Sequence, residues 1–295
     1  MFPAGVDTIR VRWATMSGGI RLRVAESGAA NDPAVLLLHG WAASIYMWRD
    51  WFAPLSAAGC RVIAIDLPGH GLSDKPVAAE VYRLDSMVGL VLEFLALEQL
   101  DRVDLVAQSM AGTIGVEVAL APGSPVRRMA LVNPACFGRV RMQRFAKLVS
   151  SHPMTDVILP RLVARWLVVR THRMVYGDPS RLTRRDEDEY WAPSQFPPFA
   201  RAMRRLLHEF QWSRPPASEM AARLGRLGQP VQVILGTRDT LVRDAALYVA
   251  ELKSAGAPIE VHEVRDGGHA VNEERPEEVI PLVLRHLAQR TGAPG

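Results

Sequence analysis

The chain has 295 residues, of which 48% are hydrophobic and 22% are charged, and this balance excludes a disordered chain and favours a globular one. The net charge is +4, and basic residues alternate with acidic ones along the chain, which argues against a nucleic-acid partner. No apolar run approaches the roughly 18 residues that span a membrane, and the first residues do not resemble a signal peptide. Cys60 and Cys136 lack metal-type spacing and are typical of buried thiols, so we expect a cytoplasmic protein.

Two segments with alternating apolar and polar residues begin the chain, at residues 6–13 and 20–26, with Ser17-Gly18-Gly19 between them. This pattern predicts a β-hairpin at the edge of a sheet. Short continuous apolar runs follow, and runs of this length are typical of strands that are buried on both faces of a parallel sheet. The runs are residues 34–38, 62–65, 103–107, 129–132, 231–235 and the weaker 259–264.

Helical segments lie between these strands. Residues 87–97 have apolar positions at helical spacing, and residues 110–120 are rich in small side chains. Pro276 begins a third helical run that ends at residue 287. The alternation of strands and helices predicts an α/β protein with a mostly parallel, doubly wound sheet.

One interval departs from this alternation. Between residues 134 and 230 the chain shows amphipathic helical pieces but no buried strand, and it is too long for a simple connection. We therefore expect residues 1–134 and 230–295 to form one core, and residues 135–229 to form a mostly helical insertion over one end of the sheet.

The segment VAQSMAGTIG, residues 106–115, places Ser109 directly after an apolar strand and directly before a helix. A nucleophile elbow, the tight turn that presents a catalytic serine, occurs in this setting. Its neighbours must be small because the backbones of strand and helix approach each other, and Ala107 and Ala111 stand where glycine is usual. The segment alone leaves two interpretations open: a strained catalytic serine, or a serine that caps the helix.

A catalytic serine needs a base that accepts its proton and an acid that orients the base. His269 is the expected base, because it follows a strand and two glycines in the segment RDGGHAVNEE. Asp239, at the end of the buried strand in VILGTRD, is the expected acid, and Asp266 is the nearby alternative. We expect His208 and His286 to lie on helix surfaces.

The oxyanion that forms during acyl transfer needs hydrogen-bond donors. The backbone N–H groups of Met110 and Trp41 are the expected donors. Trp41 lies in LLLHGWAAS, where Gly40 allows a tight turn. His39 either contacts the substrate or holds this loop as a structural residue.

The segments HGW, DLPGHGLSDKP, AQSMAG, GTRD and GGHAVNEERPEEV together resemble the motifs of the α/β-hydrolase family, over about residues 20–134 and 230–290. The resemblance implies the α/β-hydrolase fold, a triad in the order Ser, Asp, His, and a helical cap formed by residues 135–229. A serine nucleophile favours acyl chemistry, whereas an aspartate would indicate a dehalogenase or an epoxide hydrolase. Gln108 departs from the family pattern, in which histidine is frequent before the nucleophile.

Caps of this family form much of the substrate pocket, so we expect apolar cap residues to line it. The predicted substrate-binding positions are His39, Gly40, Gln108, Phe145, Trp166 and Tyr190. Further apolar candidates in the cap are Met142, Met154 and Phe196. The alternative is that these side chains form the cap's own core, and that its arginines are solvated.

These observations predict a serine hydrolase that cleaves a small-to-medium hydrophobic ester or thioester through an acyl-enzyme, without cofactor or metal. One alternative keeps the triad but makes the protein a carbon–carbon bond hydrolase or a biosynthetic acyltransferase or cyclase. Another is a non-catalytic ligand-binding or accessory protein. The expected partner is a small hydrophobic acyl substrate, and the oligomeric state is open, with a homodimer as one alternative.

Overall fold

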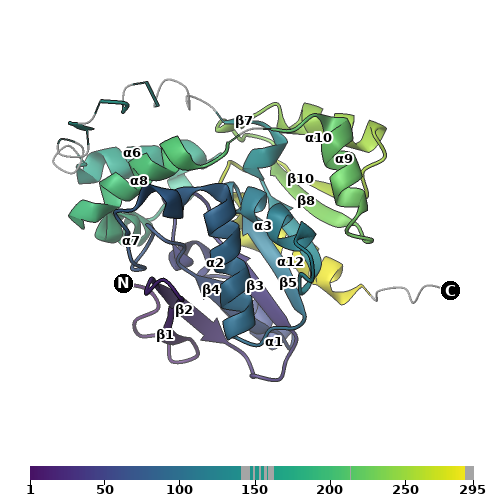
Figure 1. The fold of residues 1–295 in the computed structure, drawn as a ribbon, viewed down its shortest axis with the longest axis horizontal. Helices are drawn as coiled ribbons and strands as arrows, with labels where there is room; N and C mark the ends of the chain where they lie inside the picture. Colours follow the sequence, from purple (N-terminus) through teal and green to yellow (C-terminus); the bar gives the residue numbers. More distant parts are fainter. Residues whose placement is uncertain are drawn as a thin grey trace.

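The computed structural model describes residues 1–140, 147–148, 150–152, 154–155, 158, 163–212 and 214–289. An eight-stranded sheet with the strand order β1-β2-β4-β3-β5-β6-β8-β10 forms its centre (Figure 1). Its strands are β1 (Arg10–Thr15), β2 (Arg21–Ser27), β3 (Ala34–Leu38), β4 (Arg61–Ile65), β5 (Val103–Gln108), β6 (Val126–Val132), β8 (Val231–Gly236) and β10 (Ile259–Val264). A separate antiparallel pair joins β7 (Arg139–Val140) to β9 (Val242–Arg243).

The strand directions confirm the predicted doubly wound, mostly parallel sheet. Strands β1 and β2 form an antiparallel hairpin at one edge, and β2 pairs antiparallel with β4. From β4 to β10 all neighbouring strands are parallel. The chain leaves β3 toward β4 on one side, and β5 pairs with β3 on the other side, so the loops after β3 and β5 meet at a topological switch point.

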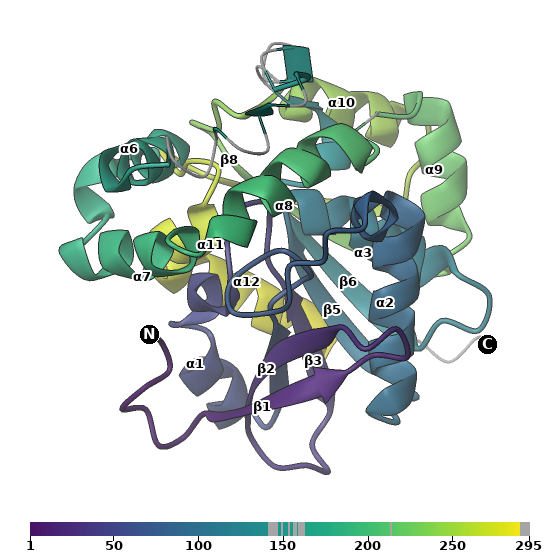
Figure 2. The ribbon, with the colours of Figure 1, turned by 60° about the vertical axis from the view of Figure 1, so that its left-hand side comes forward.

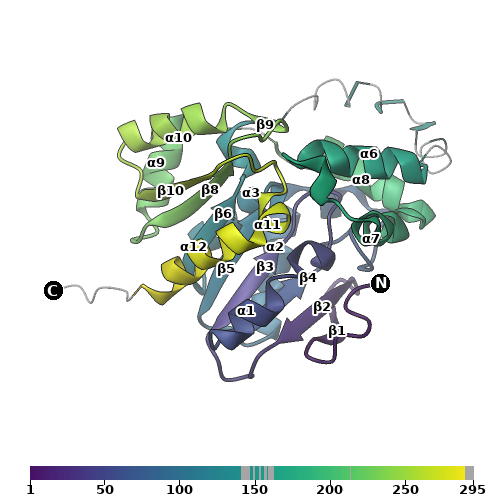
Figure 3. The same cartoon turned by 180° about the vertical axis from the view of Figure 1, so that it is seen from behind.

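The helices cover both faces of the sheet and its carboxyl edge (Figures 1 and 3). The α-helices are α1 (Phe52–Ala57), α2 (Leu84–Leu97), α3 (Met110–Leu120), α6 (Arg165–Val175), α7 (Arg184–Ser194), α8 (Pro197–Glu209), α9 (Ala217–Gly225), α10 (Ala245–Ser254), α11 (Val271–Glu274) and α12 (Pro276–Ala288). The short 3-10 helices are η1 (Ile45–Trp48), η2 (Ala79–Tyr82), η3 (Ala135–Phe137) and η4 (Pro179–Arg181). In the part of the chain that the structure describes, no helix is long and apolar enough to cross a membrane.

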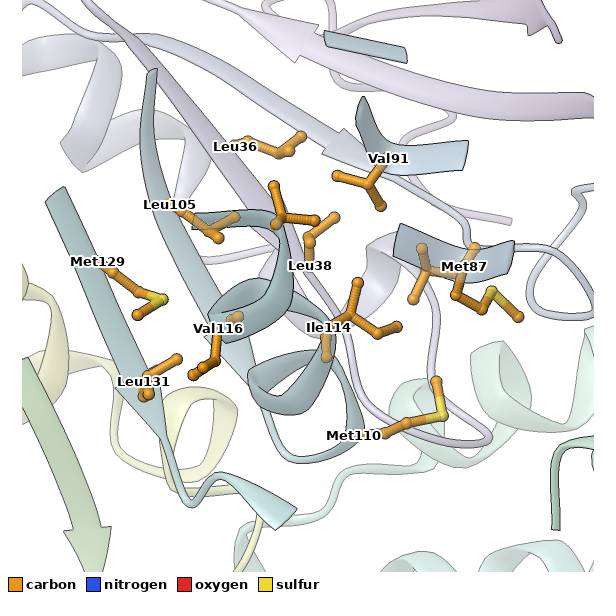
Figure 4. Packing of buried hydrophobic residues seen from close by; sticks show 14 of the residues in the cluster. Leu36, Leu38, Met87, Val91, Leu105, Met110, Ile114, Val116, Met129 and Leu131 are labelled. Carbon is orange, nitrogen blue, oxygen red and sulfur yellow. The ribbon is translucent and has the colours of Figure 1, made fainter. Parts of the chain in front are cut away.

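Two hydrophobic cores lie on opposite faces of the sheet, and β3 shows how its sequence supplies both. Leu36 and Leu38 join the core under α2 and α3, which Figure 4 shows from close by. Val35 and Leu37, the alternate residues, join the core under α1 and α12. Side chains alternate along a strand, so a continuous apolar run is what a strand between two helical layers needs.

Two sequence predictions about the sheet and the helices around it differ from the structure. The first hairpin strand begins at Arg10 rather than at residue 6, because Val6 and Ile9 donate backbone hydrogen bonds within turns. The prediction that His286 lies on a helix surface is wrong, since its side chain is buried between α12 and the sheet. Burial lowers the pKa of His286.

Helices α6, α7 and α8 gather together above the sheet (Figure 2). The indole Nε1 of Trp41, in the loop after β3, donates to the carbonyl oxygen of Met203 on α8 at 3.4 Å. The helix α9 has a different position, packing against α3 and α10 as the crossover helix between the parallel strands β6 and β8. The described helices of the interval 135–229 therefore lie at two places, above the sheet and beside it.

Candidate active site

Ser109 lies in the turn between β5 and α3, with φ 53° and ψ −118°. A positive φ in a residue other than glycine is strained and needs surrounding structure to hold it. The backbone supplies this support: the N–H of Ser109 donates to the carbonyl oxygen of Val132 at 3.0 Å, and its carbonyl oxygen accepts from Gly112 and Ala135. The Ser109 side chain makes no capping hydrogen bond to α3, so the helix-cap interpretation does not describe this serine.

The turn fits alanine because the closest approach of strand and helix lies elsewhere. Ala107 and Ala111 are fully buried. A methyl group added at Gly112 would lie 2.7 Å from Cβ of Pro134, and one at Gly115 would lie 3.0 Å from Cδ2 of Leu105. The packing therefore requires a glycine at Gly112 and leaves little room for a side chain at Gly115.

The structure brings Ser109, His269 and Asp239 into one hydrogen-bonded chain. His269 Nε2 lies 2.8 Å from the Ser109 Oγ, and His269 Nδ1 lies 2.7 Å from Asp239 Oδ2. The other oxygen of Asp239 accepts from the backbone N–H groups of Leu241 and Val242, at 2.8 and 3.0 Å. The exposed fractions of Ser109 and His269 are only 6% and 5%, so the hydrogen bond between them is shielded from water.

Asp266, the alternative acid, is engaged elsewhere. Its carboxylate pairs with Arg238 at 2.8 Å, and its backbone N–H donates to Thr237 Oγ1 at 2.8 Å. The geometry therefore distinguishes between two carboxylates that the sequence left open.

The loop after β3 lies directly against Ser109. A methyl group added at Gly40 would lie 3.0 Å from Cβ of Ser109 and would collide with Oε1 of Gln108. The next residue, Trp41, thus begins beside the serine, and Met110 follows the serine in the chain. Among the described residues, none accepts a backbone hydrogen bond from Trp41 or Met110. Both N–H groups can therefore donate to a substrate.

The ring of His39 lies behind this loop. Its Nε2 accepts from the backbone N–H of Leu67 at 3.0 Å, and its Nδ1 donates to the carbonyl oxygen of Gly40 at 2.8 Å. Burial lowers the pKa of His39, which suits a neutral ring that both donates and accepts. The substrate-binding position expected at His39 is corrected to the structural alternative, because both ring nitrogens are occupied and the residue is fully buried.

Gln108 and Tyr190, which were also predicted to contact the substrate, are buried and hydrogen-bonded within the protein as well. Gln108 is 1% exposed, and its Nε2 donates to the carbonyl oxygen of His269 at 3.0 Å. The hydroxyl of Tyr190 donates to Glu273 Oε2 at 2.6 Å in a buried position. Both polar groups are held by the protein itself, so neither is free to bind a substrate.

The remaining cap residues do not form an enclosed pocket in the described part of the chain. Trp166 on α6 is 67% exposed, and it lines an open hollow with Arg170 and Met174. Phe145 and Met142 lie outside the described residues.

Sequence reasoning missed two buried polar residues beside His269. Asn133 follows β6, and its side chain contacts the backbone around His269. Glu274 accepts the N–H of Gly268 at 2.7 Å, and also those of Gly177 and Asp178, which joins the His269 loop to the segment after α6. A polar residue directly after a buried strand was the available signal for Asn133, and Asp239 lies three residues after the end of its own buried strand.

A separate buried charged cluster is made of Tyr46, Arg49, Asp186, Tyr190 and Glu273. Arg49 contacts Glu273 at 2.7 Å and Asp186 at 3.0 Å, and Tyr46 donates to Asp186 at 2.6 Å. Burial raises the pKa of Glu273 in spite of Arg49. The cluster connects η1 and α11 to α7.

Comparisons with known proteins agree with this architecture. The family model of the α/β-hydrolase fold matches residues 33–276. A haloalkane dehalogenase of Mycobacterium marinum is 28% identical over 285 residues, covering 92% of this chain and 90% of the relative. The dihydrolipoyllysine-residue acetyltransferase component of the acetoin cleaving system of Cupriavidus necator is 26% identical, covering 96% of this chain and 68% of that protein.

Solved structures share the fold. An epoxide hydrolase without ligand superposes with a TM-score of 0.77 at 21% identity, covering 95% of this chain and 99% of that one. A 2-hydroxy-6-oxo-6-phenylhexa-2,4-dienoate hydrolase from Rhodococcus superposes with a TM-score of 0.76 at 21% identity, covering 96% of this chain and 100% of that one. The predicted family and fold are confirmed: this chain belongs to the α/β-hydrolase family and is an enzyme of that family.

Proposed function

We propose that this α/β-hydrolase is a serine hydrolase that cleaves a small-to-medium hydrophobic ester or thioester. The observation that carries the proposal is the chain of hydrogen bonds from Ser109 Oγ through His269 to Asp239, at 2.8 and 2.7 Å. A nucleophile, a base and an acid in this order and within hydrogen-bond distance are the requirement for activating a serine hydroxyl.

In the acylation step, Ser109 Oγ attacks the carbonyl carbon of the substrate while His269 Nε2 accepts the hydroxyl proton. The carbonyl oxygen becomes an oxyanion, and the backbone N–H groups of Trp41 and Met110 donate to it. His269 then gives its proton to the departing alcohol or thiol, which leaves an ester on Ser109. Asp239 remains ionised, keeps the proton of neutral His269 on Nδ1 and stabilises the imidazolium.

In the deacylation step, water takes the place of the leaving group. His269 Nε2 accepts a proton from this water as it attacks the acyl-enzyme carbonyl, and the same two N–H groups hold the second oxyanion. The proton returns to Ser109 Oγ when the bond between this oxygen and the acyl carbon breaks. The cycle releases a carboxylic acid and restores the enzyme.

The serine also argues against the reactions named for several relatives. Attack of a serine oxygen on the saturated carbon of a haloalkane or epoxide would form an ether, which has no carbonyl group for water to attack. Attack on an ester or thioester forms an acyl-enzyme, which water can hydrolyse. The chemistry of Ser109 therefore favours acyl substrates over those of the dehalogenase and epoxide hydrolase relatives.

We further propose that α6, α7 and α8 are the cap that covers the substrate. The contact of Trp41 with Met203 supports this role, because it lays α8 over the loop that supplies one oxyanion donor. Glu274 supports it as well, since it joins the His269 loop to the segment after α6. The free thiols of Cys60 and Cys136 support a cytoplasmic location.

The experiment that tests the function is labelling with a fluorophosphonate probe, followed by intact mass measurement. We expect one adduct on the wild-type protein and none on Ser109→Ala, because only an activated serine oxygen displaces fluoride from phosphorus. Ser254→Ala, which changes an exposed serine at the end of α10, is a matched control that should label fully. A folded wild-type protein that stays unlabelled would contradict the proposal.

A second candidate keeps the triad and changes the fate of the acyl group. The relative named as an acetyltransferase component, which aligns with 96% of this chain, favours acyl transfer, and the fold of the dienoate hydrolase is compatible with cleavage of a carbon–carbon bond. Product analysis separates these reactions: transfer gives a new ester or thioester when an acceptor is added, and cleavage of a β-diketone gives a ketone and an acid without an alcohol.

A further inference from the structure

We infer that Asn133 is a positioning residue, whose side-chain amide holds the backbone of His269 at the place that Ser109 and Asp239 require. The inference rests on the proposed function, since it concerns the base of that reaction. Asn133 directly follows β6, and its exposed fraction is 1%.

The Asn133 side chain makes three hydrogen bonds, each 2.9 Å long, to backbone atoms of two other segments. Its Nδ2 donates to the carbonyl oxygens of Gly268 and His269. Its Oδ1 accepts from the backbone N–H of Gly236, the last residue of β8. The amide therefore ties the end of the strand that precedes Asp239 to the loop that carries His269.

A second side-chain amide reaches the same carbonyl oxygen. Gln108 Nε2 donates to the carbonyl oxygen of His269 at 3.0 Å, and Gln108 directly precedes Ser109. The His269 carbonyl oxygen thus accepts from one amide anchored beside the nucleophile and from another anchored at the end of β6. Because the two donors come from different strands, they hold the His269 backbone relative to both.

The position of His269 matters because its ring must contact two partners at once. A base must lie within about 2.6–3.2 Å of the proton donor, and a displacement of about 1 Å can lower the rate roughly 100-fold. The ring lies 2.8 Å from Ser109 Oγ and 2.7 Å from Asp239 Oδ2. A displacement of the backbone at His269 would lengthen at least one of these contacts.

Asparagine suits this position for two physical reasons. The backbone φ of Asn133 is 42°, in the left-handed region that asparagine tolerates better than most residues. Its short side chain also offers two N–H donors and an acceptor, all of which are used here. Aspartate has the same shape but no N–H group, so it provides a selective test.

The test compares three changes of a buried amide to a carboxyl group: Asn133→Asp, Gln108→Glu and, as the control, Asn272→Asp. Asn272 lies three residues after His269 and is fully buried, and no described residue hydrogen-bonds its side chain. With p-nitrophenyl butyrate as substrate, we expect Asn133→Asp and Gln108→Glu to lower kcat about 10- to 100-fold while KM changes little. The control puts a carboxyl group at an equally buried site that does not bond to the His269 backbone, so it should lower the stability while kcat of the folded protein stays within about threefold of the wild-type value.

Proton NMR supplies a readout that does not depend on turnover. The proton between His269 Nδ1 and Asp239 should give a resonance far downfield, which Asp239→Asn identifies by its loss. We expect Asn133→Asp and Gln108→Glu to shift or broaden this resonance, and Asn272→Asp to leave it in place. A purely structural role would lower the unfolding temperature of Asn133→Asp without moving the resonance or kcat, and that result would overturn the inference.

If Asn133→Asp does not fold, Asn133→Gly decides the question, because glycine accepts the left-handed backbone and removes the amide. Wild-type resonance and kcat in Asn133→Gly would overturn the inference. If the wild-type protein is not labelled by fluorophosphonate but the resonance moves in both Asn133 variants, the proposed function fails while the positioning role of Asn133 remains.

Discussion

At the scale of single residues, the geometry identifies which carboxylate is the partner of His269. Asp266 lies three residues before His269 and Asp239 lies thirty residues before it, and only the structure shows which of them contacts the ring. Asp239 Oδ1 accepts two backbone N–H groups while Oδ2 faces His269, whereas Asp266 pairs with Arg238 at the surface. Because Oδ1 is held by two N–H groups, Oδ2 is the oxygen that accepts from His269 and keeps the proton of the neutral ring on Nδ1.

We predict that Asp239→Asn lowers kcat about 10⁴-fold, while Asp266→Asn changes it little. The N–H groups of Leu241 and Val242 will hold the oxygen of the new amide, so its NH₂ will face His269 Nδ1. His269 must then carry its proton on Nε2, where it cannot accept the proton of Ser109. Steady-state ester hydrolysis by both variants measures the difference, and a large loss in Asp266→Asn alone would identify Asp266 as the acid instead.

At the scale of elements, the contact between α3 and the segment after β6 sets the elbow. Gly112 in the first turn of α3 packs against the backbone and ring of Pro134, while Gly89 on α2 has no atom within 4 Å of the methyl group that alanine would add. The two helical glycines therefore differ in the space that surrounds them. Gly112 is required by close packing, whereas nothing in the structure explains Gly89.

We predict that Gly112→Ala destabilises the protein by about 1–3 kcal/mol, because the new methyl group would lie 2.7 Å from Cβ of Pro134. Gly89→Ala, the matched control, should stabilise it by about 0.4–1 kcal/mol through lower entropy of the unfolded chain. Urea unfolding measures both values. Equal stability of the two variants would show that α3 can move away from Pro134 at no cost.

At the scale of the whole molecule, α7 is joined to the core by buried charge as well as by apolar packing. The buried charged cluster contains one arginine, two carboxylates and two tyrosine hydroxyls, and Arg49 contacts both carboxylates. A hydrogen bond to a charged group contributes about 1.5–3 kcal/mol, more than one to a neutral carbonyl, which contributes about 0.5–1.5 kcal/mol. We therefore expect the hydrogen bonds of this cluster to contribute much of the free energy that holds α7 against the core.

We predict that Tyr190→Phe costs about 1.5–3 kcal/mol of unfolding free energy, and Tyr82→Phe about 0.5–1.5 kcal/mol. Both tyrosines are buried, but the Tyr190 hydroxyl donates to the carboxylate of Glu273, and the Tyr82 hydroxyl donates to the backbone of Pro76. Urea denaturation at neutral pH tests the order. The difference between the two losses of unfolding free energy should become smaller at a pH below the raised pKa of Glu273, because the protonated carboxyl group is a weaker acceptor.

The sequence by itself determined the properties that depend on neighbouring residues. The apolar run located β3 at its observed bounds, because a strand between two helical layers needs apolar side chains on both faces. The weaker run located β10, an edge strand whose residues alternate between apolar and polar, at its observed bounds as well. The elbow around Ser109 and the loop with Gly267, Gly268 and His269 could also be recognised from the sequence, because a tight turn requires particular residues next to one another.

Only the tertiary structure decided what depends on contacts between distant segments. It selected Asp239 over Asp266 as the partner of His269, and it gave Gln108 and Tyr190 hydrogen-bond partners within the protein. It also brought Asn133 to a backbone more than 130 residues away along the chain. A polar side chain has the same sequence signature whether it meets substrate, solvent or buried backbone, so its partner follows from how the strands and loops pack.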